Sequence, residues 1–481
     1  MINKNSIIYH LITDRFDNDD GTLENVRSDP EYRSRLLGRV GGTFKGIERR
    51  IPYLSELGVT HVMISPVERC RDDPGSYHGY DVTHPGEINP NFGTPEDLSS
   101  LVLKLEEAGI GTILDYVPLI ICNQSELFKE KVQTPEGREW FFFRDLLSHP
   151  VYGEDMQRLA ARQDCGESEY FHFFTGPHMP FFNLANQNVV NWQIERVVNS
   201  MRRYRFSDVR LDLGFYMPER VIRQFRDGIK TQVGESVSVI VENWPWPLEQ
   251  FNGGECYGFC DGELNLKGTV LLNNYGSEPH LITLLRDHFY RTKGKSDSGY
   301  AFVTGIDNHD LPRFKGDIAN QRLAAIMQFT LPNFTPIIFY GNESAMRDES
   351  PDPFAPGRGV MDFSSSSKLF DFYKQLVSFR RRNNFVAGRM NNYQYHDTND
   401  GSNFENQLVT YNLVFPEGRS YHVVVNREAR EKPANLGLLF RDPGVIPVDL
   451  LTGRELARVD EERHLIGSQD AYVLGNKVNS V

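Results

Sequence analysis

DVRLD at residues 208–212 places a carboxylate at the end of a hydrophobic, β-branched run. VIVENW at 239–244 and DNHD at 307–310 also place carboxylates at the end of such a run or just past it. Runs of this kind are typical of buried parallel strands. The carboxyl ends of parallel strands in a barrel meet at one mouth, where acids from separate strands can gather. The three stretches therefore predict a barrel enzyme with several acids at its mouth.

The phase of these strands predicts which side chains point inward. Side chains alternate along a strand, so Arg210 and Asp212 share one face while Leu211 lies on the other, apolar face. Glu242 lies in phase with Ile240. We therefore expect Arg210 and the acids to point into the barrel, where an apolar core would otherwise lie.

A purely structural role for these acids requires a partner for each, because an unpaired buried charge costs several kcal/mol. Arg210 could serve Asp212, and His309 or Arg313 could serve Asp310. For one acid alone this explanation is as good as a functional one, since structural ion pairs are common. The recurrence of acids at three strand ends favours a functional site.

Composition limits the classes of protein and of partner. The chain has 481 residues, 39% hydrophobic and 24% charged, which is typical of a globular protein with one large domain and one or two smaller ones. Its formal net charge of −13 is spread along the chain without a basic stripe, so nucleic acid and anionic membranes are not expected partners. No apolar run approaches the roughly 20 residues that span a bilayer.

The cysteines and the first residues bear on location. The five cysteines are an odd number and mostly far apart, which favours reduced thiols over a disulfide framework. A strand-like run begins at residue 6 with no small-residue cleavage site, so we expect no signal peptide. Both observations predict a cytoplasmic protein.

Strand-like runs alternate with helix-period segments along most of the chain. This alternation predicts an α/β fold, a (β/α)8 TIM barrel formed by residues 1–120 and 180–383. An inserted domain is expected at 121–179, after the third strand, and a C-terminal antiparallel β-sandwich at 384–481. The expected barrel strands are 6–13, 60–65, 111–117, 208–213, 237–242, 258–263, 301–305 and 336–340.

Several ordered motifs carry a resemblance to a known family. They are YHLITDRF at 9–16, YHGYDV at 77–82, INPNFGTPEDL at 88–98, the three acid-bearing stretches, and PIIFYGNE at 336–343. Over nearly its whole length the chain resembles the α-amylase family of retaining glycoside hydrolases and transglycosidases. The resemblance implies a barrel with a domain inserted after the third strand and a C-terminal β-sandwich, in agreement with the division above.

The resemblance also implies catalytic roles. Asp212 matches the family's nucleophile, Glu242 its general acid/base, and Asp310 its stabiliser of the transition state. Retaining chemistry needs one carboxylate to attack the anomeric carbon and a protonated one, about 5 Å away, to protonate the leaving oxygen. We expect Arg210 to lower the pKa of Asp212, and burial with nearby negative charge to raise that of Glu242.

Substrate contacts follow from the same motifs. His309 resembles the histidine that hydrogen-bonds the sugar at the cleaved bond, and Tyr80, with His78 beside it in YHGYDV, resembles the aromatic residue that stacks on that sugar. Arg210 is also expected to be among the residues that bind the substrate. Trp244 and Trp246 could form a platform on the leaving-group side, although ordinary packing is as good an explanation. The aromatic runs WFFF at 140–143 and YFHFF at 170–174 could stack on sugars or fill a core.

The chain departs from the family after the third strand. Asp115 is followed by Leu119 and Ile120, where relatives usually have asparagine and histidine. Ile120 removes a polar partner of the sugar's primary hydroxyl, so either the sugar is not an ordinary glucosyl unit or His172 or His178 supplies the contact. Leu119 cannot ligate calcium at the site that many relatives have.

The loop DNDDG at 17–21 resembles another calcium loop of the family, which makes Asp17 and Asp19 candidate ligands for a structural Ca²⁺. Acid-rich turns without a metal are also common. No cofactor is required for the chemistry expected here.

The sequence as a whole predicts a retaining α-glycosidase that hydrolyses α-glucosidic or related bonds in oligosaccharides or small glycosides. A transglycosidase using the same three acids is the near alternative, because the choice depends on how acceptor and water compete. A non-catalytic carbohydrate-binding or scaffold protein is the second alternative. The sequence leaves the oligomeric state open.

Overall fold

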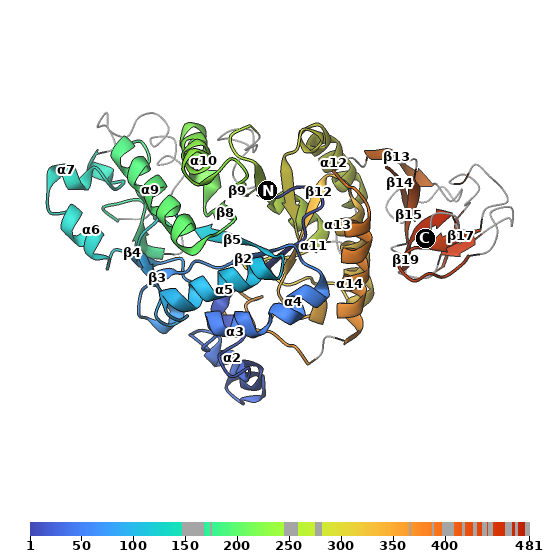
Figure 1. Ribbon diagram of the computed structural model, residues 1–481, viewed down its shortest axis with the longest axis horizontal. Coiled ribbons are helices and arrows are strands. Elements are labelled where there is room, and N and C mark those ends of the chain that lie inside the picture. Colours follow the sequence, from blue (N-terminus) through green and yellow to red (C-terminus); the bar gives the residue numbers. More distant parts are fainter. Residues whose placement is uncertain are drawn as a thin grey trace.

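A closed barrel of eight parallel strands forms the centre of the molecule (Figure 1). The computed structural model describes residues 1–146, 168–173, 176–244, 258–274, 281–364, 367–386, 389–396, 408–415, 419–426, 431–434, 440, 446–456, 464–466 and 470–476. In barrel order the strands are β1 (Ile8–Leu11), β2 (His61–Ile64), β5 (Gly111–Tyr116), β8 (Asp208–Leu211), β9 (Val239–Asn243), β10 (Gly262–Asn265), β11 (Ala301–Thr304) and β12 (Phe334–Phe339). The predicted TIM barrel is confirmed, although β10 begins later than expected and β12 earlier.

Helices surround the barrel in the alternation that the sequence predicts (Figure 1). The helix α5 shows how they begin: Thr94 and Asp97 form a reciprocal capping box, which satisfies two free backbone N–H groups. The helices of the barrel and its loops are α1 (Thr13–Phe16), α2 (Tyr32–Arg35), α3 (Phe44–Arg49), α4 (Ile51–Leu57), α5 (Pro95–Glu107), α9 (Gln187–Tyr204), α10 (Glu219–Val233), α11 (Leu266–Asn273), α12 (Leu281–Asp297), α13 (Ile318–Thr330) and α14 (Ser367–Arg382). None of the helices in the described ranges is long and apolar enough to cross a bilayer.

The barrel interior divides into an apolar part and a charged part. Ile240 belongs to a buried cluster with Ile8, Met63, Ile113, Val303 and Ile337, one side chain from each of several strands. Val241, the next residue, belongs instead to the large core between strands and helices. The predicted phase is therefore correct, and it places Glu242 on the inner face together with Ile240.

An excursion between β5 and α9 carries much of the aromatic content. Its described elements are α6 (Glu126–Lys131), α7 (Pro135–Arg138), β6 (His172–Phe173) and β7 (Gly176–Pro180). Phe142 stacks on Phe171 with ring centroids 4.4 Å apart, and Phe141 stacks on Phe182 at 5.2 Å. All four rings are buried, so they fill a core and are not free to stack on sugars.

The C-terminal part is an antiparallel sheet beside the barrel (Figure 1). Its strands are ordered β13 (Arg389–His396), β14 (Leu408–Val414), β15 (Ser420–Asn426), β19 (Asp470–Asn476) and β17 (Pro447–Asp449), and β16 (Lys432–Ala434) pairs with β18 (His464–Ile466). Phe379 of α14 contacts Tyr421 edge to face at 5.5 Å, and the hydroxyls of Thr330 and Tyr411 are hydrogen-bonded. The sheet is thus docked against the helices that cover the barrel.

Candidate active site

Arg210 lies at the centre of the charged part of the barrel and is fully buried. Its Nη1 donates to Asp115 Oδ1 at 2.6 Å and to Asp212 Oδ1 at 2.7 Å. Its Nη2 lies 2.8 Å from Glu242 Oε2. These acids come from β5, from the residue after β8 and from β9, which are neighbours in the barrel (Figure 1). One guanidinium therefore holds together carboxylates from three consecutive strands.

A second chain of contacts leads from Asp115 to Asp310. The Tyr80 hydroxyl donates to Asp115 Oδ2 at 2.7 Å and lies 2.9 Å from His309 Nε2. Because the hydroxyl proton is used on Asp115, the tyrosine oxygen accepts from His309, which places the imidazole proton on Nε2. The same Nε2 lies 3.1 Å from Asp310 Oδ2. Asp310 thus joins the network that includes Asp212 and Glu242.

Arg358 holds Asp310 from the opposite side. Its Nη2 donates to Asp310 Oδ1 at 3.0 Å, and its Nε donates to the His309 carbonyl at 2.8 Å. The contact between Asp310 and His309 was foreseen, but the suggested partner Arg313 donates instead to the carbonyls of Gly357 and Tyr340. Asp310 is less buried than the other acids, with 30% of its side chain exposed.

Two hydrogen-bond donors, in addition to the ion pair with Arg210, fix the carboxyl group of Glu242. The Leu213 N–H donates to Oε2 at 2.9 Å, and the Trp244 indole Nε1–H donates to Oε1 at 2.7 Å. Leu213 adopts a left-handed backbone conformation with φ of 51°, which is uncommon for a residue with a side chain. Trp244, for which a sugar platform and ordinary packing were equally good explanations, contacts the acid itself. Trp246 lies outside the described residues.

Three rings form a row beside the acids. Tyr80 and His309 are parallel, with centroids 5.5 Å apart, and His78 stacks on Tyr80 at 5.7 Å. The Tyr80 backbone N–H donates to His78 Nδ1 at 3.1 Å. Burial lowers the pKa of His78 to about 4 and that of His309 well below its usual value, so both rings are neutral at neutral pH.

Burial dominates the electrostatics of the acids. It raises the pKa of Glu242, as expected, and Arg210 opposes the rise. It also raises the pKa of Asp212, with Arg210 again opposing and Glu242 adding to the rise. The expectation that Arg210 would keep the pKa of Asp212 low is therefore wrong in its net direction, because desolvation outweighs the guanidinium. Four close carboxylates share the charge of two guanidiniums, so the cluster favours holding a proton.

Comparison with known proteins shows which sequences this chain resembles. The sequence model described as Alpha amylase, catalytic domain, matches residues 10–243, a span that includes Arg210, Asp212 and Glu242. Residues 10–243 of this chain are therefore similar to the catalytic domain of the α-amylase family. "Alpha-amylase 2" of Dictyoglomus thermophilum is 29% identical over 405 residues, which are 78% of this chain and 63% of that protein. A "Cyclomaltodextrinase" of Geobacillus thermopakistaniensis is 25% identical over 472 residues, 94% of this chain and 74% of that one.

Solved structures of the family share the fold. The α-amylase of Geobacillus thermoleovorans, determined in complex with acarbose, superposes with a TM-score of 0.77 over 98% of both chains, at 19% identity. The aligned residues cover 63% of the Dictyoglomus relative, so this chain spans less than two thirds of the length of that protein.

Ile120 and Leu119, where this chain departs from the α-amylase family pattern, are both buried in the large core. Ile120 pairs with Phe181 through an isolated β-bridge. Of the two histidines suggested as substitutes, His178 has its Nε2 3.8 Å from Asp81 Oδ2 in the YHGYDV motif, whereas His172 Nδ1 contacts its neighbour's carbonyl, Phe173 O, at 2.8 Å. His178 is therefore the better placed of the two.

The loop at 17–21 does not offer a free set of metal ligands. Asp17 accepts from Arg50 Nε at 2.6 Å, and Asp19 accepts from the Thr43 hydroxyl at 2.5 Å. Lys45 lies 4.0 Å from Asp19. No three His, Cys, Asp or Glu side chains in the described parts of the chain come together in a way that could hold a metal ion. Because a guanidinium already neutralises Asp17, these residues do not fit the predicted calcium ion.

Asp115, Arg358 and Leu213 belong to the site but were not predicted as members. Asp115 could have been found from strand phase, since Ile113, two residues earlier, faces the barrel interior. Arg358 comes from a segment without regular secondary structure, and the Leu213 contribution is a backbone N–H. Neither leaves a periodic signal in the sequence.

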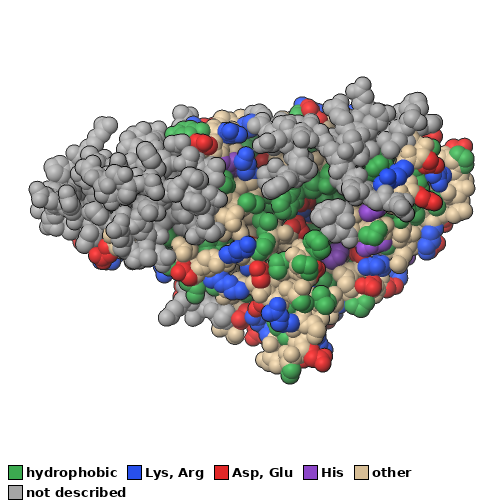
Figure 2. Space-filling model, turned by 180° about the vertical axis from the view of Figure 1, so that it is seen from behind, with side chains coloured by type: hydrophobic (Ala, Val, Ile, Leu, Met, Phe, Trp, Pro, Cys, Tyr) green, Lys and Arg blue, Asp and Glu red, His purple; other side chains and the backbone are tan. Residues whose placement is uncertain are grey.

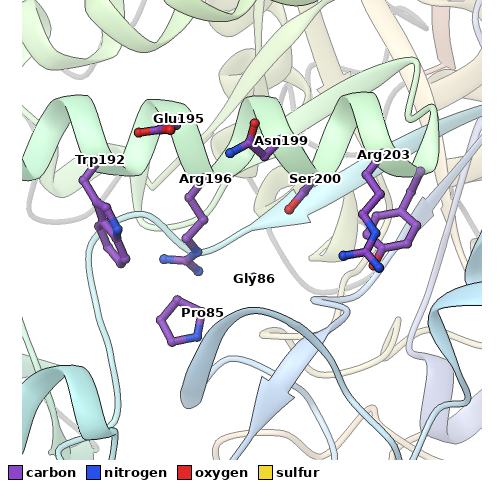
Figure 3. Close-up of a pocket in the computed structure, with 9 residues that line it drawn as sticks. Pro85, Gly86, Trp192, Glu195, Arg196, Asn199, Ser200 and Arg203 are labelled. Atoms are coloured by element: carbon purple, nitrogen blue, oxygen red, sulfur yellow. The ribbon is translucent and has the colours of Figure 1, made fainter.

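The surface of the molecule has hollows of different kinds. Figure 2 shows one face of the molecule with a hollow in which acidic side chains are seen among hydrophobic ones, with histidines near its edge. Figure 3 shows a separate groove between α9 and residues Pro85 and Gly86 of β4 (Val82–Ile88). Its volume is about 440 Å³. Arg196 in this groove is engaged by Glu68 and Gln193, and Trp192 packs on Phe182. The groove thus offers no free buried charge, unlike the acid cluster.

Proposed function

We propose that this chain is a retaining α-glycosidase that hydrolyses α-glucosidic or closely related bonds in oligosaccharides or small glycosides. The observation that carries the proposal is the contact of Asp212 and Glu242 with the two terminal nitrogens of one buried guanidinium, Arg210. Retaining enzymes need their two carboxyl groups about 5 Å apart, and two carboxyl groups sharing one guanidinium are suited to that spacing.

Asp212 is the proposed nucleophile. Its Oδ1 is held by Arg210 Nη1, which fixes the carboxylate and leaves Oδ2 to attack the anomeric carbon. Attack forms a covalent glycosyl-enzyme and expels the leaving oxygen, and water activated by Glu242 then releases the sugar with the original anomeric configuration. The raised pKa of Asp212 sets a lower pH limit, because only the ionised form attacks.

Glu242 is the proposed general acid/base. Burial raises its pKa, so the carboxyl group can hold the proton that the leaving oxygen needs. When water replaces the leaving group, the ionised Glu242 accepts a proton from it. The same group thus works once as an acid and once as a base.

Asp310, His309 and Tyr80 are proposed to bind the sugar at the cleaved bond. Asp310 is the most exposed of the acids and carries a negative charge beside the site of the developing oxocarbenium ion, which it stabilises. His309 Nε2–H lies between Tyr80 and Asp310, where sugar hydroxyls can take over its hydrogen bonds. With Ile120 buried, we assign to His178 the missing contact with the primary hydroxyl.

The test follows the products of hydrolysis by proton NMR on a panel of α-linked disaccharides, maltooligosaccharides, cyclodextrins and aryl α-glucosides. We expect the first product to be the α-anomer, and Asp212→Asn to reduce kcat by about 10⁴-fold or more. Asp227→Asn, an exposed acid on α10, is the matched control and should keep native activity.

Other outcomes distinguish the alternatives. Disaccharide or longer products in place of free sugar, at high acceptor concentration, would identify a transglycosidase that uses the same acids. Equal background rates for the native protein and Asp212→Asn across the whole panel, with binding of the oligosaccharides retained, would instead identify a carbohydrate-binding protein. A β-anomer as first product would exclude the retaining mechanism.

A further inference from the structure

We propose that Trp244 is a positioning residue that fixes the direction in which Glu242 delivers its proton to the leaving oxygen. The inference rests on the proposed function of Glu242 as the general acid. It differs from the sequence-based expectation, in which Trp244 contacts the substrate as a platform. The observation behind it is the hydrogen bond of 2.7 Å from the Trp244 indole N–H to Glu242 Oε1.

The proton of Glu242 cannot lie on Oε2. Leu213 donates its backbone N–H to that oxygen at 2.9 Å, and Arg210 Nη2 lies 2.8 Å from it. Both groups carry hydrogens and cannot accept one. A proton on Oε2 would lie against the Leu213 N–H or the Arg210 guanidinium, so the neutral carboxyl group carries its proton on Oε1.

Oε1 has two favourable positions for hydrogen in the plane of the carboxyl group. A protonated oxygen keeps acceptor capacity, so it can carry its own proton and still accept the indole N–H. Trp244 occupies one of the two positions, and the acidic proton therefore takes the other. The indole in this way selects one orientation of the O–H group.

Trp244 is held firmly enough for this role. It follows β9 directly and packs against the apolar cluster of the barrel interior that includes Ile240 and Leu264. Its indole is fixed by two torsion angles, so packing on one side leaves little freedom. The donor is therefore in place before the substrate binds, as pre-organised catalytic hydrogen bonds are.

The experiment uses leaving groups that differ in their need for a proton. Native protein and Trp244→Phe are compared on aryl α-glucosides of increasing leaving-group pKa and on α-glucosyl fluoride, whose departure needs little acid assistance. We expect kcat/KM to fall about 10-fold or more for the poorest leaving group, and by less than about 3-fold for the fluoride. Glu242→Gln should show the same order of substrates with larger losses.

The pH profile gives an independent measurement. An N–H that donates to a carboxylate stabilises the ionised form, so its removal raises the pKa of Glu242. The basic limb of kcat/KM for Trp244→Phe should therefore move to higher pH. Trp244→His, which keeps a ring N–H, should restore part of the native profile.

Trp192→Phe is the matched control, because it makes the same exchange in the groove of Figure 3, away from the acids. It should leave both the leaving-group dependence and the pH profile unchanged. Equal losses for every leaving group, or a KM that rises with the number of sugars on the leaving side, would overturn the proposal in favour of a platform. Native protein that is inactive on all these substrates would instead refute the proposed function.

Discussion

The acids at the strand ends and the acids of the loop at 17–21 are equally prominent in the sequence, yet they meet opposite surroundings. Asp212 and Glu242 are buried and converge on one guanidinium. In the loop, Asp19 is exposed and accepts a hydrogen bond from the Thr43 hydroxyl, and Asp17, although buried, pairs with Arg50. Neighbouring strands bring the acids at their ends together, whereas an acid of a separate loop turns to the nearest donor, so carboxylates at the ends of neighbouring strands are better evidence of a site.

The largest effect should come from removing the charge that holds the strand-end acids together. Arg210→Met leaves the carboxylates of Asp115, Asp212 and Glu242 without their cation, which costs about 3–5 kcal/mol of stability for a broken buried pair. We expect lower thermal stability and loss of hydrolysis. As a control, Arg196→Met breaks the buried ion pair with Glu68 and should lower the melting temperature without lowering the activity of the folded protein. An equal loss of activity per folded molecule in both variants would contradict a special role for Arg210.

Asp115→Asn should give the next largest effect. The substitution weakens the hydrogen bonds from Arg210 and from the Tyr80 hydroxyl, both of which end on this carboxylate. Two weakened charged hydrogen bonds together amount to about 3 kcal/mol, or roughly 100-fold in kcat/KM. As a control, Asp208→Asn alters a buried acid at the other end of β8 and should leave kcat/KM near the native value. Similar losses of kcat/KM in the two variants would contradict a role for the hydrogen bonds of Asp115.

The pH dependence distinguishes buried from exposed acids. In the proposed mechanism Glu242 is the proton donor, and burial raises its pKa, so the protonated form persists to higher pH than in an exposed glutamate. The basic limb of kcat/KM should therefore lie above 4.5, the ordinary value for this side chain. Glu242→Gln should abolish this limb for good leaving groups, and a native limb at the ordinary value would refute the argument from burial.

The smallest effect is expected at the loop. Asp19→Asn, and separately treatment with a chelator, should change activity by less than about 2-fold and leave the melting temperature nearly unchanged, because the loop acids already have protein partners. Calcium titration by calorimetry provides the direct readout. A melting temperature that falls on chelation and recovers with Ca²⁺ would show that this loop, in spite of Arg50, binds a cation.

Strand phase predicted most of the barrel and the core of the site. Hydrophobic runs located the strands, and alternation placed Arg210 and Glu242 on the inner face, because both depend on local periodicity. The same alternation places Asp115 on the inner face of the barrel, because it lies two residues after the inward-facing Ile113. Fold and inward-facing acids were thus predictable from short stretches.

Other features depend on long-range packing. Arg358 reaches Asp310 from a segment 48 residues later that has no periodic pattern. The net rise in the pKa of Asp212 follows from its degree of burial, which the sequence of one strand does not contain. From the sequence, the aromatic residues at 141–143 and 171 could either stack on sugars or fill a core. Only their burial and their contacts in the folded protein identify them as core residues.

The left-handed turn at Leu213 has a mechanical consequence. The residue that follows Asp212 in the chain supplies the N–H that holds Glu242, at a conformation costing roughly 1–2 kcal/mol for a residue with a side chain. One peptide group therefore ties the main chain at residue 212 to the carboxyl group of Glu242. In the proposed mechanism, the nucleophile and the general acid/base are joined in this way by the backbone as well as by Arg210.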